Sequence, residues 1–314
     1  MSPFLTYVPI FYTDTLSIPF GIAGIYYYFL YEQKNAKKRF LVIAGILLGM
    51  GYFIKSTIII IVIAIIIYNL VKEKKEKIIQ IIQKICLLLL GVLVPFLTLK
   101  IYVYQNFDAK ISDEIKFPAT HYIMMGLKNN GGYDADDQNY TGSYKGIKNK
   151  EKANIKIIKE RVNKMIKNNT LIEFYTNKIV YTWGDGTFFA PKKLNRLPKQ
   201  DYKIKDCILD NGKNSNFIYK IFAQVQWMLV ILFVIIGCLF RKYLSEKQRD
   251  LQLLLNISIF GIFLLLLLWE TRSRYLVNLL PIYLVSASIG LEAIKKYLLY
   301  KKEGIYNETQ KTKK

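Results

Sequence analysis

Long uninterrupted apolar segments dominate this sequence and limit the folds open to it. They cover residues 15–31, 40–54, 57–71, 85–104, 217–240, 251–269 and 275–294. A helix needs roughly 20 apolar residues to cross a bilayer. Segments 40–54 and 57–71 are each shorter than that, and joined they would overshoot it, so we expect two short helices that turn at Lys55-Ser56. The sequence predicts an all-α membrane protein with about seven transmembrane helices.

Basic residues in the short loops indicate which way these helices point. Four clusters stand out: Lys34, Lys37, Lys38 and Arg39; Lys72, Lys74, Lys75 and Lys77; Arg241, Lys242, Lys247 and Arg249; and the lysines from Lys295 onward. Seven alternating spans place all four clusters on one side, as the positive-inside rule requires. We therefore expect a multi-pass protein of the cell (plasma) membrane, with an external N-terminus and a cytoplasmic C-terminus.

The same reading divides the chain into four parts. Residues 1–104 carry the first four transmembrane helices and residues 217–294 the last three. Residues 105–216 form an external domain of mixed, mostly helical structure, in which 154–167 reads as a basic amphipathic helix that lies on the leaflet or covers the domain. Residues 295–314 are a basic cytoplasmic tail, which we expect to be disordered after Lys301.

Composition limits the possible partners and metal sites. Lys and Arg number 45 against 23 acidic residues, a net charge of +22, and the basic loops explain much of it without a nucleic-acid partner. One histidine and three cysteines exclude a histidine-rich or thiolate metal cage, so any metal site would consist mostly of oxygen ligands.

Two charged residues lie where apolar helices should meet the external surface. Asp14 precedes the first span and is the only acid among the first thirty residues. It is either a helix N-terminal acid favoured by the macrodipole or a residue that coordinates a metal, an acceptor or a phosphate. Lys55 interrupts a long apolar stretch, either as a snorkelling lysine or as a contact for a lipid phosphate.

A third charged group separates the last two spans. Glu270-Thr-Arg-Ser-Arg-Tyr places Arg272 and Arg274 on the expected external side, where the positive-inside rule disfavours arginine. Guanidinium groups bind phosphate oxygens in a bidentate manner, so with Lys55 the pair would form a phosphate clamp. The alternative is a plain interfacial anchor. We expect Lys55, Arg272 and Arg274 to converge.

The long segment offers weaker candidates. His121 stands in Phe-Pro-Ala-Thr-His-Tyr and alone would be an ordinary loop histidine. The aspartates of Tyr-Asp-Ala-Asp-Asp, at 134, 136 and 137, fit a solvated turn better than a metal motif. Trp183-Gly-Asp-Gly-Thr reads as a tight turn whose aromatic ring could stack on a sugar.

As an ordered set, these motifs resemble the GT-C superfamily. The set is Asp14, the Gly-x-x-x-x-x-Lys that ends at Lys55, His121, and Glu-x-Arg-x-Arg-Tyr from Glu270 with Pro281 after it. The superfamily comprises membrane glycosyltransferases that take sugar from a polyprenyl-phosphate carrier. The likeness is to the branch that contains protein O-mannosyltransferases and the bacterial aminoarabinose transferase of lipid A, and to cell-envelope transferases of Gram-positive bacteria.

The resemblance implies a function and a set of site residues. The chain would transfer a hexosyl or pentosyl group to a cell-envelope acceptor. The donor would be a polyprenyl-phosphate-linked sugar among the membrane lipids, and no nucleotide cofactor would be needed. Asp14 would be a catalytic, active-site carboxylate, and His121 would join it in binding a divalent metal. Lys55, Glu270, Arg272, Arg274 and Tyr275 would bind substrate.

One departure from the family keeps other functions open. Family members begin with further helices and an external loop that holds the catalytic aspartate, whereas this sequence matches only the middle and end of such an enzyme. The chain could therefore be an inactive, truncated relative that transfers sugar poorly by itself. A non-catalytic flippase for lipid-linked sugars, or an accessory subunit, is the other alternative, although charges at helix ends favour a transferase over a transporter.

Overall fold

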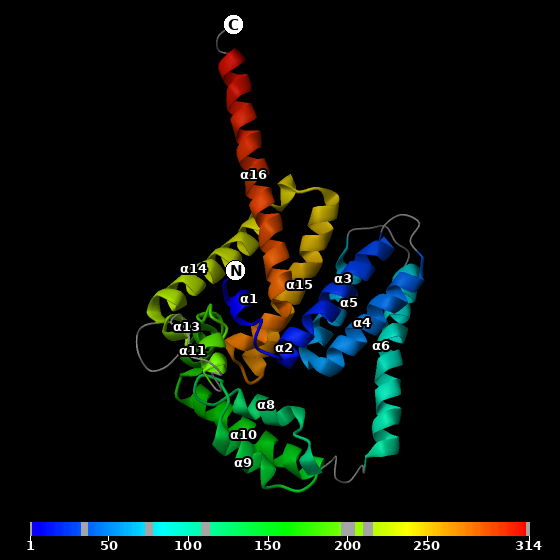
Figure 1. The fold of residues 1–314 in the computed structure, drawn as a ribbon, viewed down its shortest axis with the longest axis vertical. Helices are drawn as coiled ribbons and strands as arrows, with labels where there is room; N and C mark the ends of the chain where they lie inside the picture. Colours follow the sequence, from blue (N-terminus) through cyan, green and yellow to red (C-terminus); the bar gives the residue numbers. More distant parts are fainter. Residues whose placement is uncertain are drawn as a thin grey trace.

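The computed structural model describes residues 2–32, 37–72, 78–107, 114–195, 205–209 and 216–311, and within these ranges it contains helices and no strand (Figure 1). The helices of the bundle are α3 (Ile18–Glu32), α4 (Arg39–Ile54), η1 (Ser56–Ile58), α5 (Ile59–Val71), α6 (Ile78–Asn106), α14 (Phe217–Leu239), η3 (Arg241–Tyr243), α15 (Glu246–Leu268), η4 (Ser273–Leu279) and α16 (Leu280–Lys311). Two short helices, α1 (Ser2–Thr6) and α2 (Thr13–Leu16), precede them.

The apolar segments form helices where the sequence predicts them, and the break at Lys55 is confirmed. Helix α4 ends at Ile54, Lys55 is extended with φ −147° and ψ 110°, and η1 begins at Ser56. At 1.5 Å per residue, α4 is about 24 Å long and α5 about 20 Å. Neither helix alone matches a hydrocarbon core of about 30 Å.

Four helical stretches are long and apolar enough to cross a membrane. They are Ile78–Asn106, Phe217–Leu239, Glu246–Leu268 and Ser273–Lys302, found among the described residues. The segments Arg39–Ile54 and Ser56–Val71 are apolar but shorter. A membrane protein built of helices is therefore supported, whereas the number of seven spans stays a prediction.

The helices run alternately up and down, so their ends fall into two groups (Figure 1). One end of the bundle carries α2, the Lys55 turn and the loop that leads into η4; we call it the Lys55 end. The other carries the C-terminal end of α5, η3 and the far part of α16; we call it the basic end. Of the cations that predicted this side, Lys34, Lys74, Lys75 and Lys77 lie outside the described residues.

The long middle segment is attached to the Lys55 end. Its helices are α8 (Ala119–Met125), α9 (Ala135–Gly142), α10 (Ile147–Lys167), α11 (Leu171–Trp183), α12 (Ala190–Leu194) and α13 (Lys205–Ile208). Backbone amides of Glu270 and Thr271 donate to the carbonyls of Tyr122 and Gly131, both at 2.8 Å. The predicted amphipathic helix exists as α10, which begins seven residues earlier than expected.

The tail is helical as far as Lys311, so the expectation of disorder after Lys301 is wrong for residues 302–311. Helix α16 continues without interruption from Leu280 to Lys311, far beyond its neighbours (Figure 1). Propagation of an existing helix costs little, and Lys, Glu, Leu and Gln are good helix formers, so a charged sequence can extend a transmembrane helix.

A close crossing of α14 and α16 depends on two glycines. A Cβ atom on Gly290 would lie 1.8 Å from the carbonyl oxygen of Phe233, and a Cβ on Gly237 would lie 3.0 Å from the Cα of Gly290. Such close approach of backbones is a common way for membrane helices to associate. The crossing therefore fixes α16, and with it η4, against α14.

Gly290→Ala should lower the free energy of unfolding by roughly 1–3 kcal/mol, because the methyl group forces α14 and α16 apart. Thermal unfolding in detergent would measure the loss. Gly142→Ala is the matched control, since a Cβ there meets no atom within 4 Å. Equal melting temperatures for the two variants would contradict the close crossing.

A buried lysine joins the middle segment to the end of α15. The Lys178 side chain is 1% exposed, and its Nζ donates to the carbonyl oxygens of Gly126 (2.6 Å) and Leu267 (2.9 Å). Burial lowers the pKa of Lys178 to about 8, against a smaller opposing effect of Glu270. Between this value and the unfolded pKa of about 10.4, the unfolded chain binds a proton that the folded chain does not.

This difference predicts a pH dependence of stability. Stability should rise as the pH increases from about 8 to about 10.4, because over this range the unfolded state binds more protons. Lys178→Met should remove that part of the pH profile. Melting temperatures of both proteins, taken at intervals from pH 7 to pH 11, would test it, and parallel profiles would exclude the assignment.

Candidate functional site

Three segments that are far apart in the sequence meet at the Lys55 end: α2, the Lys55 turn and η4. A hydrogen bond of 2.6 Å from Asn278 Nδ2 to Thr57 Oγ1 joins η4 to η1. Helix α2 contacts α3, α4 and η4. The charged residues predicted from the sequence therefore gather in one place because the turns that carry them are held together.

Asp14 and Lys55 form a buried ion pair. Asp14 is fully buried, and its Oδ1 lies 2.7 Å from Lys55 Nζ, whose side chain is 17% exposed. In the part of the chain that the structure describes, Asp14 Oδ2 has no hydrogen-bond partner. An unsatisfied buried carboxylate oxygen is costly, so this atom is available to accept a hydrogen bond from a ligand.

Tyr275 occupies the centre of the cluster. Lys55 Nζ lies 4.5 Å from the centroid of its ring, and Arg274 Cζ lies 5.1 Å from the same centroid. The Tyr275 hydroxyl donates to Glu270 Oε2 at 2.9 Å. The structure thus brings Lys55, Arg274 and Glu270 around one aromatic ring, although the sequence separates Lys55 from the other two by more than two hundred residues.

Arg272 lies beside this group, on the side of the middle segment. Glu270 Oε1 is 3.9 Å from Arg272 Nε, and Arg272 Cζ lies over the rings of Tyr133 (5.4 Å) and Phe189 (5.2 Å). The Nε atoms of both Arg272 and Arg274 are buried and have no hydrogen-bond partner among the described residues. Two buried Nε donors without a hydrogen bond among the described residues are suited to bind an anion.

Two further residues of the cluster carried no signal in the sequence. Lys193 Nζ lies 4.5 Å and Arg274 Cζ 4.8 Å from the ring centroid of Tyr12. Burial opposes ionisation of the Tyr12 phenol, but Arg274 and Lys193 outweigh it and hold the pKa of Tyr12 below its usual value. The local potential is therefore positive. Sequence reasoning missed Tyr12 because it is one of 24 tyrosines.

The predicted turn after Trp183 forms, and its acid organises a loop. Asp185 accepts hydrogen bonds from Ser273 Oγ (2.6 Å) and from the backbone amides of Thr187 (3.0 Å) and Phe189 (2.9 Å). Phe188 and Phe189 both have positive φ, 52° and 63°, which is unusual for residues other than glycine. Strained backbone of this kind often accompanies a ligand site, and here it places Phe189 against Arg272.

A cavity opens beside this loop. Its volume is about 290 Å³, at the lower end of the range for small-molecule sites. The residues that line it are Tyr181, Asp185, Thr187, Phe189, Pro191, Lys192, Lys220 and Ser273. Since Phe189 and Ser273 also border Arg272, the cavity adjoins the cluster.

The expected pairing of His121 with Asp14 is not formed. The His121 side chain is 3% exposed, its Nδ1 hydrogen-bonds Thr141 Oγ1 at 2.9 Å, and Thr141 donates to Asn154 Oδ1 at 2.9 Å. Phe117 packs on the imidazole ring. His121 therefore has a structural place between α8, α9 and α10, within the middle segment, and desolvation lowers its pKa.

A divalent metal does not fit this arrangement. Asp14 is already paired with an ammonium group, and the imidazole of His121 is bonded elsewhere. No group of three or more His, Cys, Asp and Glu side chains suited to a metal occurs within the described ranges.

The weaker candidates of the middle segment also have structural partners. Asp134 caps α9 by accepting from the Asp137 amide. Asp137 is not solvated as expected but 4% exposed, with both oxygens 2.7 Å from Arg161. The Trp183 ring packs on Phe263, with centroids 5.1 Å apart.

The fold and this cluster define an all-helical membrane protein with a cationic, aromatic site at one end of its bundle. The chain belongs to a family described as conserved hypothetical integral membrane protein, whose model matches residues 3–295. No curated protein and no solved structure matches the chain.

Lys55→Met should lower the free energy of unfolding by about 3–5 kcal/mol, because it leaves the buried Asp14 carboxylate without its cation. The double variant Asp14→Asn/Lys55→Met should regain most of the loss. Thermal unfolding of the three proteins in one detergent would measure this. A double variant less stable than Lys55→Met would contradict a mutually compensating ion pair.

Proposed function

We propose that this chain is a membrane glycosyltransferase that takes sugar from a polyprenyl-phosphate carrier and passes it to a cell-envelope acceptor at the external surface. The observation that carries the proposal is the convergence of Lys55 and Arg274 on the Tyr275 ring, with Arg272 beside them. Fixed cations in a partly desolvated site bind a lipid phosphate strongly.

The proposed reaction needs charge stabilisation and a base. The bond between the anomeric carbon and the phosphate oxygen breaks, and the lipid phosphate leaves with the electron pair. The acceptor hydroxyl forms a new bond to the anomeric carbon and gives up its proton. Lys55, Arg272 and Arg274 would stabilise the departing phosphate, where preorganised cations contribute most.

Asp14 is the proposed base, and its pairing with Lys55 suggests how it is released. A bound donor phosphate would compete with Asp14 for the Lys55 ammonium group, which is 2.7 Å from the carboxylate in the structure. Transfer of Lys55 to the phosphate would free the carboxylate to accept the proton. General-base help of this kind is typically worth about 10²–10⁴ in rate.

An apolar groove gives the lipid chain a place. Its volume is about 500 Å³, and it lies between α11, α14 and α15. Trp183, Ile231, Ile235, Phe260, Phe263 and Tyr283 are among the residues that line it. Trp183 lines this groove, and Asp185, two residues later, lines the polar cavity beside the cluster. A polyprenyl chain in the groove would therefore have its phosphate near the cluster.

A non-catalytic protein that binds lipid-linked sugar, either a flippase or an accessory subunit, is the second candidate. The closed Asp14–Lys55 pair favours it, since a fully buried carboxylate held by a cation is not poised as a base. The two candidates agree on phosphate binding and differ only in turnover.

Arg274→Gln should weaken binding of a polyprenyl-phosphate sugar roughly tenfold or more, because a charge-assisted pair of hydrogen bonds is lost. Binding to the purified full chain in detergent would be measured with a radiolabelled donor. Lys301→Gln, on α16 at the basic end, is the control and should bind as the wild type does. Unchanged affinity in Arg274→Gln would contradict the clamp.

Turnover would then separate the two candidates. In the same preparation, transfer of label to cell-envelope acceptors should be abolished by Asp14→Asn while donor binding persists. Binding without transfer in the wild-type chain would exclude the transferase and support the non-catalytic protein.

A further inference from the structure

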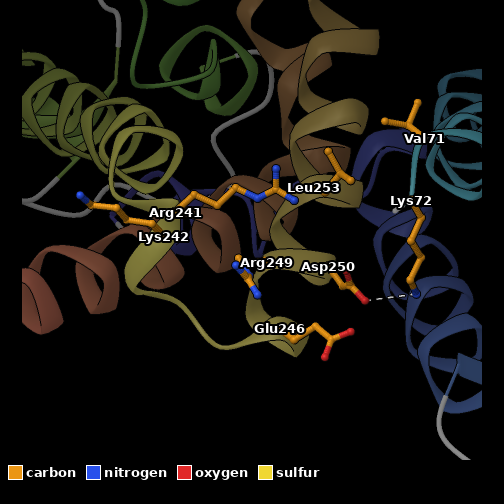
Figure 2. A pocket seen from close by; sticks show the side chains of 8 residues that line it. All are labelled: Val71, Lys72, Arg241, Lys242, Glu246, Arg249, Asp250 and Leu253. Atoms are coloured by element: carbon orange, nitrogen blue, oxygen red, sulfur yellow. Dashed lines mark ion pairs between the residues drawn. The ribbon is translucent and has the colours of Figure 1, made fainter. Parts of the chain in front are cut away.

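A second polar cavity lies at the basic end, away from the cluster just described. Its volume is about 450 Å³, and Figure 2 shows the residues that line it: Val71, Lys72, Arg241, Lys242, Glu246, Arg249, Asp250 and Leu253. They come from the end of α5, from η3 and from the first turns of α15. Helix α5 starts just after the Lys55 turn and ends at this cavity, so about 20 Å of helix separates the two sites.

The cations of this cavity differ in whether the protein neutralises them. Lys72 pairs with Glu32 and, at 3.2 Å, with Asp250. Neither Arg241 nor Arg249 forms an ion pair within the part of the chain that the structure describes. In Figure 2 their guanidinium groups point into the space between η3 and α15, whereas Lys242 points away. The cavity therefore presents two guanidinium groups that no carboxylate of the described residues neutralises.

The net charge and the position of the cavity both favour an anion. With Lys72 and Asp250 paired to each other and Lys242 pointing away, Arg241 and Arg249 face the cavity against one acidic side chain, Glu246. The cavity also adjoins the N-terminal turn of the 23-residue helix α15, where the helix dipole favours negative charge. Glu246 offsets one of the two positive charges, so the cavity keeps a net positive charge.

The cavity also has an apolar side. Val71 is 56% exposed at the end of α5, next to Leu70 at 59%, and Leu253 lines the wall from α15. Leu254 and Leu255 follow Leu253 in α15, and α5 is apolar from Ile59 to Ile67. A ligand that is anionic at one end and apolar at the other would satisfy both sides of the cavity.

We propose that this cavity binds the headgroup of an anionic phospholipid, with the phosphate between the guanidinium groups of Arg241 and Arg249. The lipid's apolar part lies along Val71 and Leu253. Basic pockets between helices at a membrane surface bind anionic lipid headgroups in this manner. The proposal does not depend on the proposed function, since its residues lie at the opposite end of the bundle.

Thermal unfolding of the purified full chain in a neutral detergent would test it. Dioctanoyl phosphatidylglycerol is the probe, dioctanoyl phosphatidylcholine is the neutral-headgroup control, and inorganic phosphate tests for a free anion. We expect phosphatidylglycerol to raise the melting temperature of the protein to a plateau as the lipid concentration increases. In Arg241→Gln/Arg249→Gln the half-saturating concentration should rise at least about tenfold.

The controls decide between the possible outcomes. Lys301→Gln/Lys302→Gln removes two charges from α16 and should respond as the wild type does. Arg241→Lys/Arg249→Lys keeps the charge and should bind more weakly than wild type, since lysine cannot form the bidentate fork. If Arg241→Gln/Arg249→Gln fails to fold, the weaker binding of Arg241→Lys/Arg249→Lys tests the proposal in its place.

Three results would overturn the proposal. An equal response to phosphatidylcholine would show that the headgroup charge is not recognised. An undiminished response in both arginine variants would place the lipid elsewhere. A response to inorganic phosphate at the same concentrations would identify a site for free phosphate instead of a lipid.

Discussion

The buried ion pair between Asp14 and Lys55 is the interaction on which the architecture of the Lys55 end depends. A carboxylate that is fully buried needs a cation close by, and the Lys55 side chain supplies it at 2.7 Å. To do so, the chain must break between α4 and η1, which makes two short helices out of one long apolar stretch. The pair also holds α2 against the turn, in contact with η4, which carries Arg274.

Charged side chains gather at the two ends of the bundle, and the surroundings of the cations differ between the ends. At the Lys55 end, cations are interleaved with aromatic rings, so Lys55 and Arg274 contact Tyr275 while Arg272 contacts Phe189. At the basic end, Lys72 and Lys242 also lie over rings, those of Tyr68 and Tyr243, while Arg241 and Arg249 border the cavity. Buried cations that stack on aromatic rings are held in fixed geometry, as catalysis or selective binding requires.

The sequence predicts the helices well because apolar length and a single misplaced charge are local signals. Lys55 and Arg274 could be selected for the same reason, since charge at an apolar helix end is costly and needs an explanation. Lys178, Asp185 and Tyr12 could not be selected, because their roles arise from partners distant in sequence. His121 was assigned to Asp14 by resemblance, but packing within the middle segment decides its partners. The helical tail shows that charge alone does not predict disorder.

Photocrosslinking can locate the phosphate of a bound lipid on this chain. A polyprenyl phosphate with a photoreactive group next to the phosphate would be bound to the full chain, irradiated, and the labelled peptides identified by mass spectrometry. If Lys55, Arg272 and Arg274 bind the phosphate, the label will be found in α2, around the Lys55 turn and in η4. An excess of unlabelled polyprenyl phosphate will remove it. Labels confined to the basic end, or spread evenly along the lipid-facing helices, would contradict a phosphate site built by Lys55, Arg272 and Arg274.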